Sequence, residues 1–189
     1  MCTNIDDSQL ISQVKSGKVD AFKSLVERHQ DYVFTLCYRV LGNREDAEEV
    51  TQDSFVKAFN GLSSFQGQAK FTTWIYRIAM NAAISYRRKK RVHLETLEDF
   101  KKLDQGEISN MVEYQKLEQK KFLQIALNTL LPDDASVLTL FYFKELSLEE
   151  MSEITGINVS TLKVKLYRAR KRLAAALKNL LQQEVSSLI

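Results

Sequence analysis

The chain has 189 residues, of which 44% are hydrophobic and 27% charged, with six glycines, one proline and a net charge of +3. This length suits one or two domains with cores of their own, and the scarcity of glycine and proline favours helices over hairpins. The isolated cysteines and histidines, the polar N-terminal segment and the lack of a long apolar run argue against a metal site, a secreted protein and a membrane span, so we expect a cytoplasmic protein without a cofactor and without membrane insertion.

Hydrophobic residues recur at helical spacing through the first half of the chain. This periodicity predicts four helices, at residues 7–15, 20–41, 46–59 and 71–91. Residues 60–69, with two glycines, two serines and two glutamines, are expected to form a loop. One side of the third helix should face the core with Ala47, Val50, Ser54 and Ala58. The core face of the fourth helix is expected to carry Phe71, Ile75, Ile78 and Ala82.

The junction between the loop and the fourth helix, residues 65–81, mixes aromatic, amide and basic side chains. Aromatic faces stack on unpaired bases and basic groups attract phosphates, so this segment could bind melted DNA. A structural role competes with this interpretation. Phe71 is expected in the core, Trp74 fits core packing as well as base stacking, and Tyr76 lies off the apolar stripe and should be the more exposed aromatic. Asn81, a weak helix former, either makes an internal hydrogen bond or contacts DNA.

Charge is distributed unevenly along the chain. Residues 54–91 contain eight basic side chains and no acidic one, a local charge of +8. Residues 92–115 contain six acidic and two basic side chains, a local charge of −4, and their apolar periodicity is weak. Because the alternation typical of strands is missing as well, we expect two small all-α domains joined by a flexible acidic linker.

Helical spacing resumes near Glu113 and stops before Pro132, and a further helix is expected from Asp133 or Asp134 through Tyr142. A helix-turn-helix pattern then occupies residues 146–172.

Local signals mark each boundary of the helix-turn-helix. Ser147 is placed to cap the first helix, and Glu150 completes a capping box with it. Gly156 supplies the left-handed residue that ends this helix, and Ser160 is expected to cap the second helix. A stripe with helical spacing, expected to be buried, consists of Leu162, Leu166, Ala169 and Leu173.

A basic face accompanies that stripe on the second helix. It comprises Thr161, Lys165, Arg168 and Arg172, with Lys163 and Lys171 beside them. No acidic residue occurs between Val159 and Gln183, whereas a merely solvated helix would normally mix the two signs. The pattern favours a helix that enters the major groove of DNA, although membranes, RNA or a calmodulin-like partner also attract basic helices.

Several of these segments together resemble the extracytoplasmic-function (ECF) sigma factors of bacterial RNA polymerase. The resemblance rests on residues 46–59, 65–74, 77–81, 132, 148–156 and 161–172. It implies a promoter-melting and polymerase-docking domain at 1–91 (sigma region 2-like), a linker at 92–115 and a helix-turn-helix domain at 116–189 (sigma region 4-like). The chain departs from the family at Ser160-Thr-Leu-Lys163, where Gly-Thr-Val-Lys is usual, so its base preference could differ.

The resemblance also implies roles for individual residues. The helix at 46–59 would dock on the clamp helices of the largest polymerase subunit through Glu49, Gln52 and Asp53. The loop at 60–70 would capture a flipped base of the melted −10 element. Contacts to the −10 element would come from Phe65, Gln66, Gln68, Lys70, Trp74, Arg77, Asn81 and Arg88. Contacts to the −35 element would come from Ser160, Thr161, Lys163, Lys165, Arg168 and Arg172.

The expected partners are therefore core RNA polymerase, through its clamp helices and its flap, and promoter DNA. Members of the family are often held by an anti-sigma protein, which is the third implied partner. We expect no enzymatic activity, because no phosphate-binding loop, paired catalytic set or metal spacing occurs. The alternative is a helix-turn-helix regulator that binds duplex DNA without any role at the polymerase core.

Overall fold

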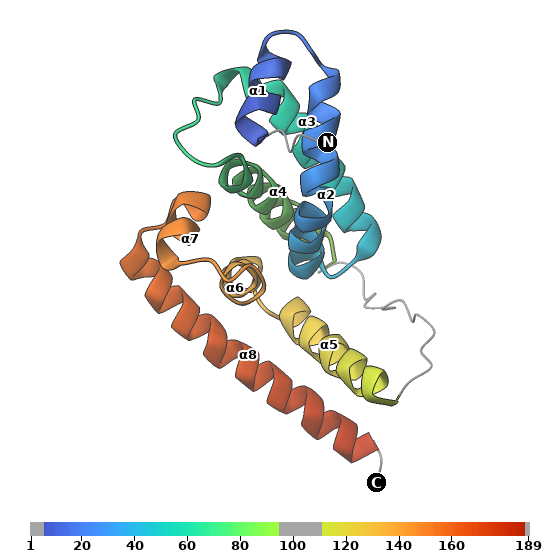
Figure 1. Cartoon of the computed structure of the whole chain (residues 1–189). Coiled ribbons are helices and arrows are strands. Elements are labelled where there is room, and N and C mark those ends of the chain that lie inside the picture. The colour runs from blue at the N-terminus through green and yellow to red at the C-terminus, as the bar shows by residue number, and fades with distance from the viewer. Residues whose placement is uncertain (1–5, 95–110, 188–189) are drawn as a thin grey trace.

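The computed structural model describes residues 6–94 and 111–187, and these residues form helices without any strand (Figure 1). The N-terminal half contains α1 (Asp7–Lys15), α2 (Asp20–Leu41), α3 (Arg44–Gly61), a 3-10 turn (Leu62–Ser64) and α4 (Phe71–Leu94). The C-terminal half contains α5 (Met111–Thr129), α6 (Pro132–Leu138), a π-helical turn (Thr139–Phe143), α7 (Leu148–Thr155) and α8 (Val159–Ser187). The predicted all-α fold with two helical domains is confirmed.

In the N-terminal domain α2, α3 and α4 pack against one another, and α1 lies on α2. The predicted core face of α3 is buried at Ala47, Val50, Ser54 and Ala58. α3 begins at Arg44 rather than at Asp46, because the side chain of Asn43 accepts a hydrogen bond from the Asp46 amide at 2.8 Å and caps the helix.

The helix-turn-helix begins and turns as its sequence predicts. The Ser147 hydroxyl accepts from the Glu150 amide at 3.1 Å, and the Glu150 carboxylate accepts from the Ser147 amide at 2.9 Å. Gly156 has a φ of 72°, the left-handed conformation that glycine adopts at little cost.

The predicted cap of α8 is wrong. Asn158, not Ser160, accepts a hydrogen bond from the Thr161 amide at 2.8 Å, and the Ser160 hydroxyl donates to the same Asn158 oxygen at 2.8 Å. Asparagine is as good a cap as serine, and Asn158 lies two positions before the predicted cap. α8 consequently begins at Val159, and Ser160 is an exposed residue of its first turn.

The helix predicted from Asp133 or Asp134 through Tyr142 begins at Pro132 and is α-helical only in its first half. α6 ends at Leu138, and the chain continues as the π-helical turn of residues 139–143. The Thr139 hydroxyl donates to the Ala135 carbonyl at 2.8 Å, which competes with the regular backbone ladder.

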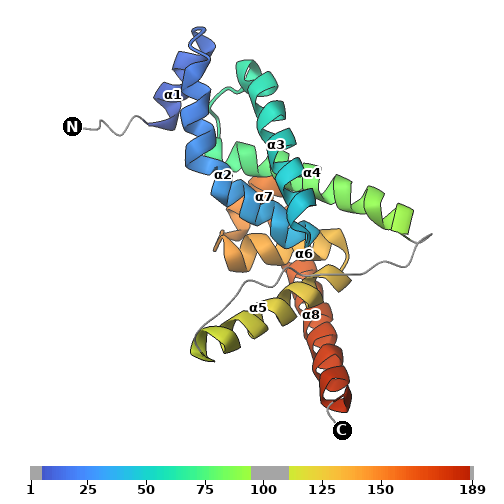
Figure 2. The same ribbon diagram turned by 90° about the vertical axis from the view of Figure 1, so that its right-hand side faces the viewer.

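The two domains lie against each other in the structure. α4 contacts α6 and α7, and α2 contacts α5 and α6, while α8 extends away from the N-terminal domain (Figures 1 and 2). Residues 95–110, most of the predicted acidic linker, lie outside the described residues, and α4 and α5 extend into the ends of the 92–115 segment. Within residues 6–94 and 111–187, no helix has the length and hydrophobicity needed to cross a bilayer.

Candidate nucleic-acid interface

α8 carries the basic face that the sequence predicts. Its buried stripe is formed by Leu162, Leu166 and Ala169, which anchor the helix against the rest of its domain. Ser160, Thr161, Lys163 and Arg168 are exposed on the same helix. The hydroxyls and cations at these positions are therefore accessible to a nucleic acid.

Two other basic residues of α8 have acidic partners at the start of α6. The Arg172 guanidinium lies 2.5 Å from an Asp134 carboxylate oxygen, and the Lys165 ammonium lies 3.7 Å from Asp133. Asp134 is buried and Lys165 is half-buried. In this arrangement the charges of Lys165 and Arg172 are partly neutralised from within the chain.

The second candidate surface is the loop before α4. Gln66 and Gln68 are exposed, and the Gln68 amide donates to the Gln66 side-chain oxygen at 3.1 Å. Between them Gly67 has a φ of +72°, and nothing lies within 4 Å of the position that its Cβ would occupy. The loop thus exposes two amide groups on either side of a left-handed residue, with open space beside the backbone.

An aromatic cluster links this loop to the start of α4. The Phe65 ring centroid lies 4.9 Å from that of Trp74 and 6.2 Å from that of Phe71, and the Phe71 and Trp74 rings are 5.8 Å apart. Phe71 is buried, as predicted, whereas Phe65 and Trp74 are half-buried. The Trp74 ring therefore packs in the cluster and is only partly accessible, and its role in base stacking stays a prediction.

Tyr76 contradicts the prediction that it is the more exposed aromatic, because it is only 9% exposed. The Lys144 ammonium of the other domain lies 5.6 Å from its ring centroid, and burial raises the pKa of the phenol. The buried side of α4 is formed by Phe71, Ile75, Tyr76, Ala79, Met80 and Ala83, so Tyr76 lies on it, whereas Ile78 and Ala82 of the predicted core face are only half-buried. The predicted core face was therefore wrong in its direction, because it followed the apolar Ile78 and Ala82 rather than Tyr76, Ala79 and Ala83.

Along α4 the remaining predicted −10 residues differ in their accessibility. Lys70, Arg77 and Asn81 are exposed, and no described side chain or backbone group hydrogen-bonds to the Asn81 amide. Arg88 is also exposed, but its guanidinium pairs with Asp133 of the second domain at 2.7 Å.

The third predicted surface lies on α3, where Glu49, Gln52 and Asp53 are exposed. Glu49 accepts a hydrogen bond from the Tyr86 hydroxyl at 3.2 Å, and the same hydroxyl donates to the buried Asp46 at 2.9 Å. Burial and these two carboxylates raise the pKa of Tyr86. The polar side of α3 therefore rests on α4 and keeps Gln52 and Asp53 outward.

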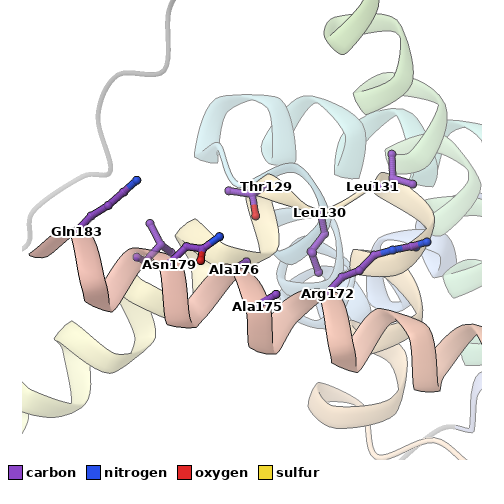
Figure 3. A pocket seen from close by; sticks show the side chains of 9 residues that line it. Thr129, Leu130, Leu131, Arg172, Ala175, Ala176, Asn179 and Gln183 are labelled. Carbon is purple, nitrogen blue, oxygen red and sulfur yellow. The ribbon is translucent and has the colours of Figure 1, made fainter.

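A groove that the sequence analysis missed runs between the end of α5 and α8 (Figure 3). Its volume is about 570 Å³, and its lining is largely apolar, with Leu130 and Leu131 on one side and Ala175, Ala176 and Leu180 on the other. The run of three alanines at 174–176 was the available signal, because small side chains leave a hollow beside a helix.

Comparison with protein families gives two matches in chain order. Residues 25–92 match the family model of Sigma-70 region 2, and residues 123–173 match that of Sigma-70, region 4. The ECF RNA polymerase sigma factor SigW of Bacillus subtilis is 35% identical, with 90% of this chain and 96% of that protein covered. The ECF RNA polymerase sigma-E factor of Haemophilus influenzae is 33% identical, with 90% and 95% covered.

Solved structures show the same fold. The structure of CnrH in complex with the cytosolic domain of CnrY is similar with a TM-score of 0.65 and 26% identity, over 90% of this chain and 96% of that one. The structure of the sigma factor RpoE in complex with the anti-sigma factor NepR from Bartonella quintana has a TM-score of 0.63 and 25% identity, over 83% and 96%.

Proposed function

This chain belongs to the extracytoplasmic-function (ECF) family of RNA polymerase sigma factors, and from that premise we propose how its surfaces divide the work of promoter recognition. It is a sigma factor that directs promoter-specific transcription initiation. The observation that carries the proposal is that an exposed basic helix and an exposed amide-bearing loop lie in different domains. We assign residues 1–91 to docking and melting and residues 116–189 to duplex binding.

We assign the −35 element to α8. Ser160, Thr161 and Lys163 lie in its first turns and are exposed, as a recognition helix requires for residues that reach base edges. Lys165, Arg168 and Arg172 follow toward the C-terminal end, where they would hold phosphates. Lys165 and Arg172 must exchange their acidic partners for DNA to do so.

The −10 element is assigned to the loop and to α4. A flipped base fits the open space beside Gly67, where the amides of Gln66 and Gln68 could bond its edge. Phe65 and Trp74, which are half-buried in the aromatic cluster, would stack on that base. The backbone of the melted strand would follow α4 and the residue before it, through the exposed Lys70, Arg77, Asn81 and Arg88.

Docking on core polymerase is assigned to two surfaces. The exposed Glu49, Gln52 and Asp53 of α3 would contact the clamp helices, in line with the family resemblance. The apolar groove between α5 and α8 would accept an apolar segment of the flap, because a hollow of this size suits large aliphatic or aromatic side chains.

An anti-sigma protein is the remaining partner in the proposal, since RpoE of Bartonella quintana was solved with the anti-sigma factor NepR. The relatives are sigma factors rather than enzymes. We propose that this chain likewise has no catalytic activity and determines which promoters the polymerase recognises.

Reconstituted transcription tests this assignment. The purified chain is combined with core polymerase, and run-off transcripts are mapped on a library of genomic fragments from its host. Core polymerase alone and core with the Glu49→Lys, Asp53→Lys double variant are the controls. Transcripts that start downstream of a shared pair of motifs only with the parent chain support the proposal. Duplex binding without any polymerase-dependent transcript would favour the regulator alternative instead.

A further inference from the structure

His29 of α2 is a buried ionisable side chain that none of the assigned surfaces uses. It is 5% exposed, and its Nε2 lies 2.8 Å from an Asp7 carboxylate oxygen in the first turn of α1. Because a carboxylate accepts hydrogen bonds, His29 supplies the proton of this bond from Nε2. The other Asp7 oxygen accepts from the Arg28 guanidinium at 2.5 Å. Leu10 and Ile11 are buried one turn later, so the start of α1 is firmly placed on α2.

His29 also contacts the aromatic cluster at the start of α4. Its ring centroid lies 5.4 Å from that of Phe71, and the two rings are inclined at 52°. Phe71 in turn packs against Phe65 and Trp74. Residues 65–70, which we call the −10 loop, run from Phe65 to the residue before Phe71. The imidazole therefore connects α1 to the C-terminal end of that loop.

The N-terminal end of the −10 loop is held by the other end of α1. Lys15, the last residue of α1, donates to the Phe65 carbonyl at 2.5 Å, and α1 contacts the 3-10 turn that precedes the loop. Inside residues 65–70, all of which the structure describes, the only hydrogen bond between side chains joins Gln68 to Gln66. The conformation of the loop therefore depends on contacts from outside it, and α1 and His29 supply such contacts at its two ends.

We propose that Asp7 and His29 are positioning residues for base capture, which act by holding α1 and Phe71 where they fix the −10 loop. This inference rests on the proposed function, because that function assigns the loop to a flipped base. An amide selects one base edge only when it is held in one orientation before the base arrives, since a mobile loop can turn to other bases and loses entropy on binding. A hydrogen bond outside the loop thus determines how selectively the −10 element is read.

Amide hydrogen exchange of the free chain tests the positioning directly. The Phe65 amide donates to the Leu62 carbonyl at 3.2 Å, and the Trp74 amide donates to the Lys70 carbonyl at 3.1 Å. Exchange at these two amides therefore reports opening at either end of the loop. In Asp7→Asn we expect both amides to exchange about 3- to 10-fold faster, because a charge-assisted and largely buried hydrogen bond is lost.

A third amide and a control variant separate local opening from a general loss of stability. The Ala47 amide at the start of α3 donates to the Asn43 carbonyl at 3.1 Å in the same domain, and its exchange should stay unchanged in Asp7→Asn. The matched control is Asp20→Asn, the same substitution at an exposed carboxylate in the first turn of α2, which should leave all three amides unchanged. Equal acceleration at Ala47, or none at the two loop amides, would overturn the inference.

Two substitutions at His29 separate its two contacts. His29→Gln keeps an N–H donor for Asp7 and removes the ring, whereas His29→Phe keeps a ring against Phe71 and removes the donor. We expect His29→Phe to accelerate exchange mainly at Phe65, which is tied through α1, and His29→Gln mainly at Trp74, which is tied through Phe71. The reverse pattern, or equal effects at both amides, would contradict the positioning role of His29. If either variant fails to fold, as circular dichroism would reveal, Asp7→Asn at its partly exposed side chain decides the matter.

Selectivity for the captured base is the functional readout. Run-off transcription is compared on premelted templates that carry the preferred base or another base at the recognised position. We expect Asp7→Asn to lower the ratio of these two rates about 3- to 5-fold, with recovery of core polymerase and binding to the −35 duplex unchanged, whereas Asp20→Asn keeps the parental ratio. A residue that only stabilises the fold would lower both rates together, and an unchanged ratio would therefore refute the positioning role.

A double-mutant cycle separates this inference from the proposed function. In the background of Gln66→Ala with Gln68→Ala, Asp7→Asn should cause no further loss of selectivity, because the positioned amides are already absent. A full additional loss would overturn the inference. If the alanine variant itself keeps parental selectivity, the assignment of the loop to base capture has failed. If that variant loses selectivity and Asp7→Asn does not, only the positioning role has failed.

Discussion

Lys15 at the end of α1 donates a hydrogen bond to the carbonyl oxygen of Phe65 at 2.5 Å. The bond joins the first helix of the chain to the loop assigned to the −10 element. Leu10 and Ile11 of α1 are buried, so this helix is firmly placed on α2 and can serve as a fixed support for the loop.

Lys15→Met should loosen the loop without unfolding the domain. Since an exposed, charge-assisted bond contributes about 0.5–1 kcal/mol, we expect a loss of about 2- to 5-fold in open-complex formation. Permanganate reactivity of melted thymines on a cognate promoter measures it. Lys18→Met, an exposed lysine of the following turn, is the control. A comparable loss in the control would mean that charge rather than the Phe65 bond matters.

Replacing Gln66 and Gln68 by alanine should blur the preference for one base of the −10 element. The amides are the exposed groups beside Gly67, and each hydrogen bond to a base edge that is lost should cost about 1 kcal/mol. Run-off transcription from premelted templates that vary at that base is the measurement, and −35 duplex binding should stay unchanged. If activity falls equally for every base, the loop is structural and the base-capture role is withdrawn.

Arg168→Ala should weaken binding to the −35 duplex. Arg168 is exposed on α8 and has no ion pair among the residues that the structure describes. The loss should be about 1–3 kcal/mol if the residue reads a base, and the salt slope should fall by about one unit if it holds a phosphate. Fluorescence anisotropy across a salt series separates these cases. Lys178→Ala, farther along the same helix, provides the comparison, and equal effects in both variants would remove the assignment.

Charge reversal at Glu49 and Asp53 should abolish co-purification with core polymerase. Both side chains are exposed on α3, and exposed residues seldom hold a fold together, so the circular dichroism spectrum should be preserved. The control is charge reversal at Glu149 and Glu153 of α7, which changes the net charge by the same amount on the other domain and should leave co-purification intact. Wild-type recovery of core with the α3 variant would place the docking surface elsewhere.

Asn158→Ala should lower the stability of the helix-turn-helix by about 1 kcal/mol, because it removes the cap of α8. Ser160→Ala should have a smaller effect, since the Ser160 hydroxyl only donates to the Asn158 side chain. Thermal unfolding of the two variants compares them, and a larger loss for Ser160→Ala would restore Ser160 as the cap.

The contrast between these two residues illustrates what local sequence signals can predict. Ser147, Glu150 and Gly156 act through neighbours within four positions, and the structure has all three as the pattern indicates. Ser160 was predicted as the next cap, but Asn158 is a residue type of similar capping quality, and its side chain is the one that reaches the Thr161 amide.

Contacts between the two domains could not be predicted from the sequence pattern. Arg87 belongs to a basic run that suggests a phosphate-binding surface, yet its guanidinium donates to carbonyls at the end of α5 and just after it, 40 to 43 positions away. Helical periodicity reports which side of a helix is buried in its own domain and gives no information about a second domain that packs on it.

Trp74 is the single tryptophan of the chain, and its ring lies at the base of the proposed base-capture loop. A Cβ on Gly61 would lie 3.4 Å from this ring, so the indole also contacts the end of α3. The tryptophan emission of the protein therefore comes from one half-buried indole beside the loop. Its quenching by a stacked base, or its change in wavelength as water enters the cluster, can be followed in unlabelled protein during promoter melting. The chain carries its own optical reporter of that step.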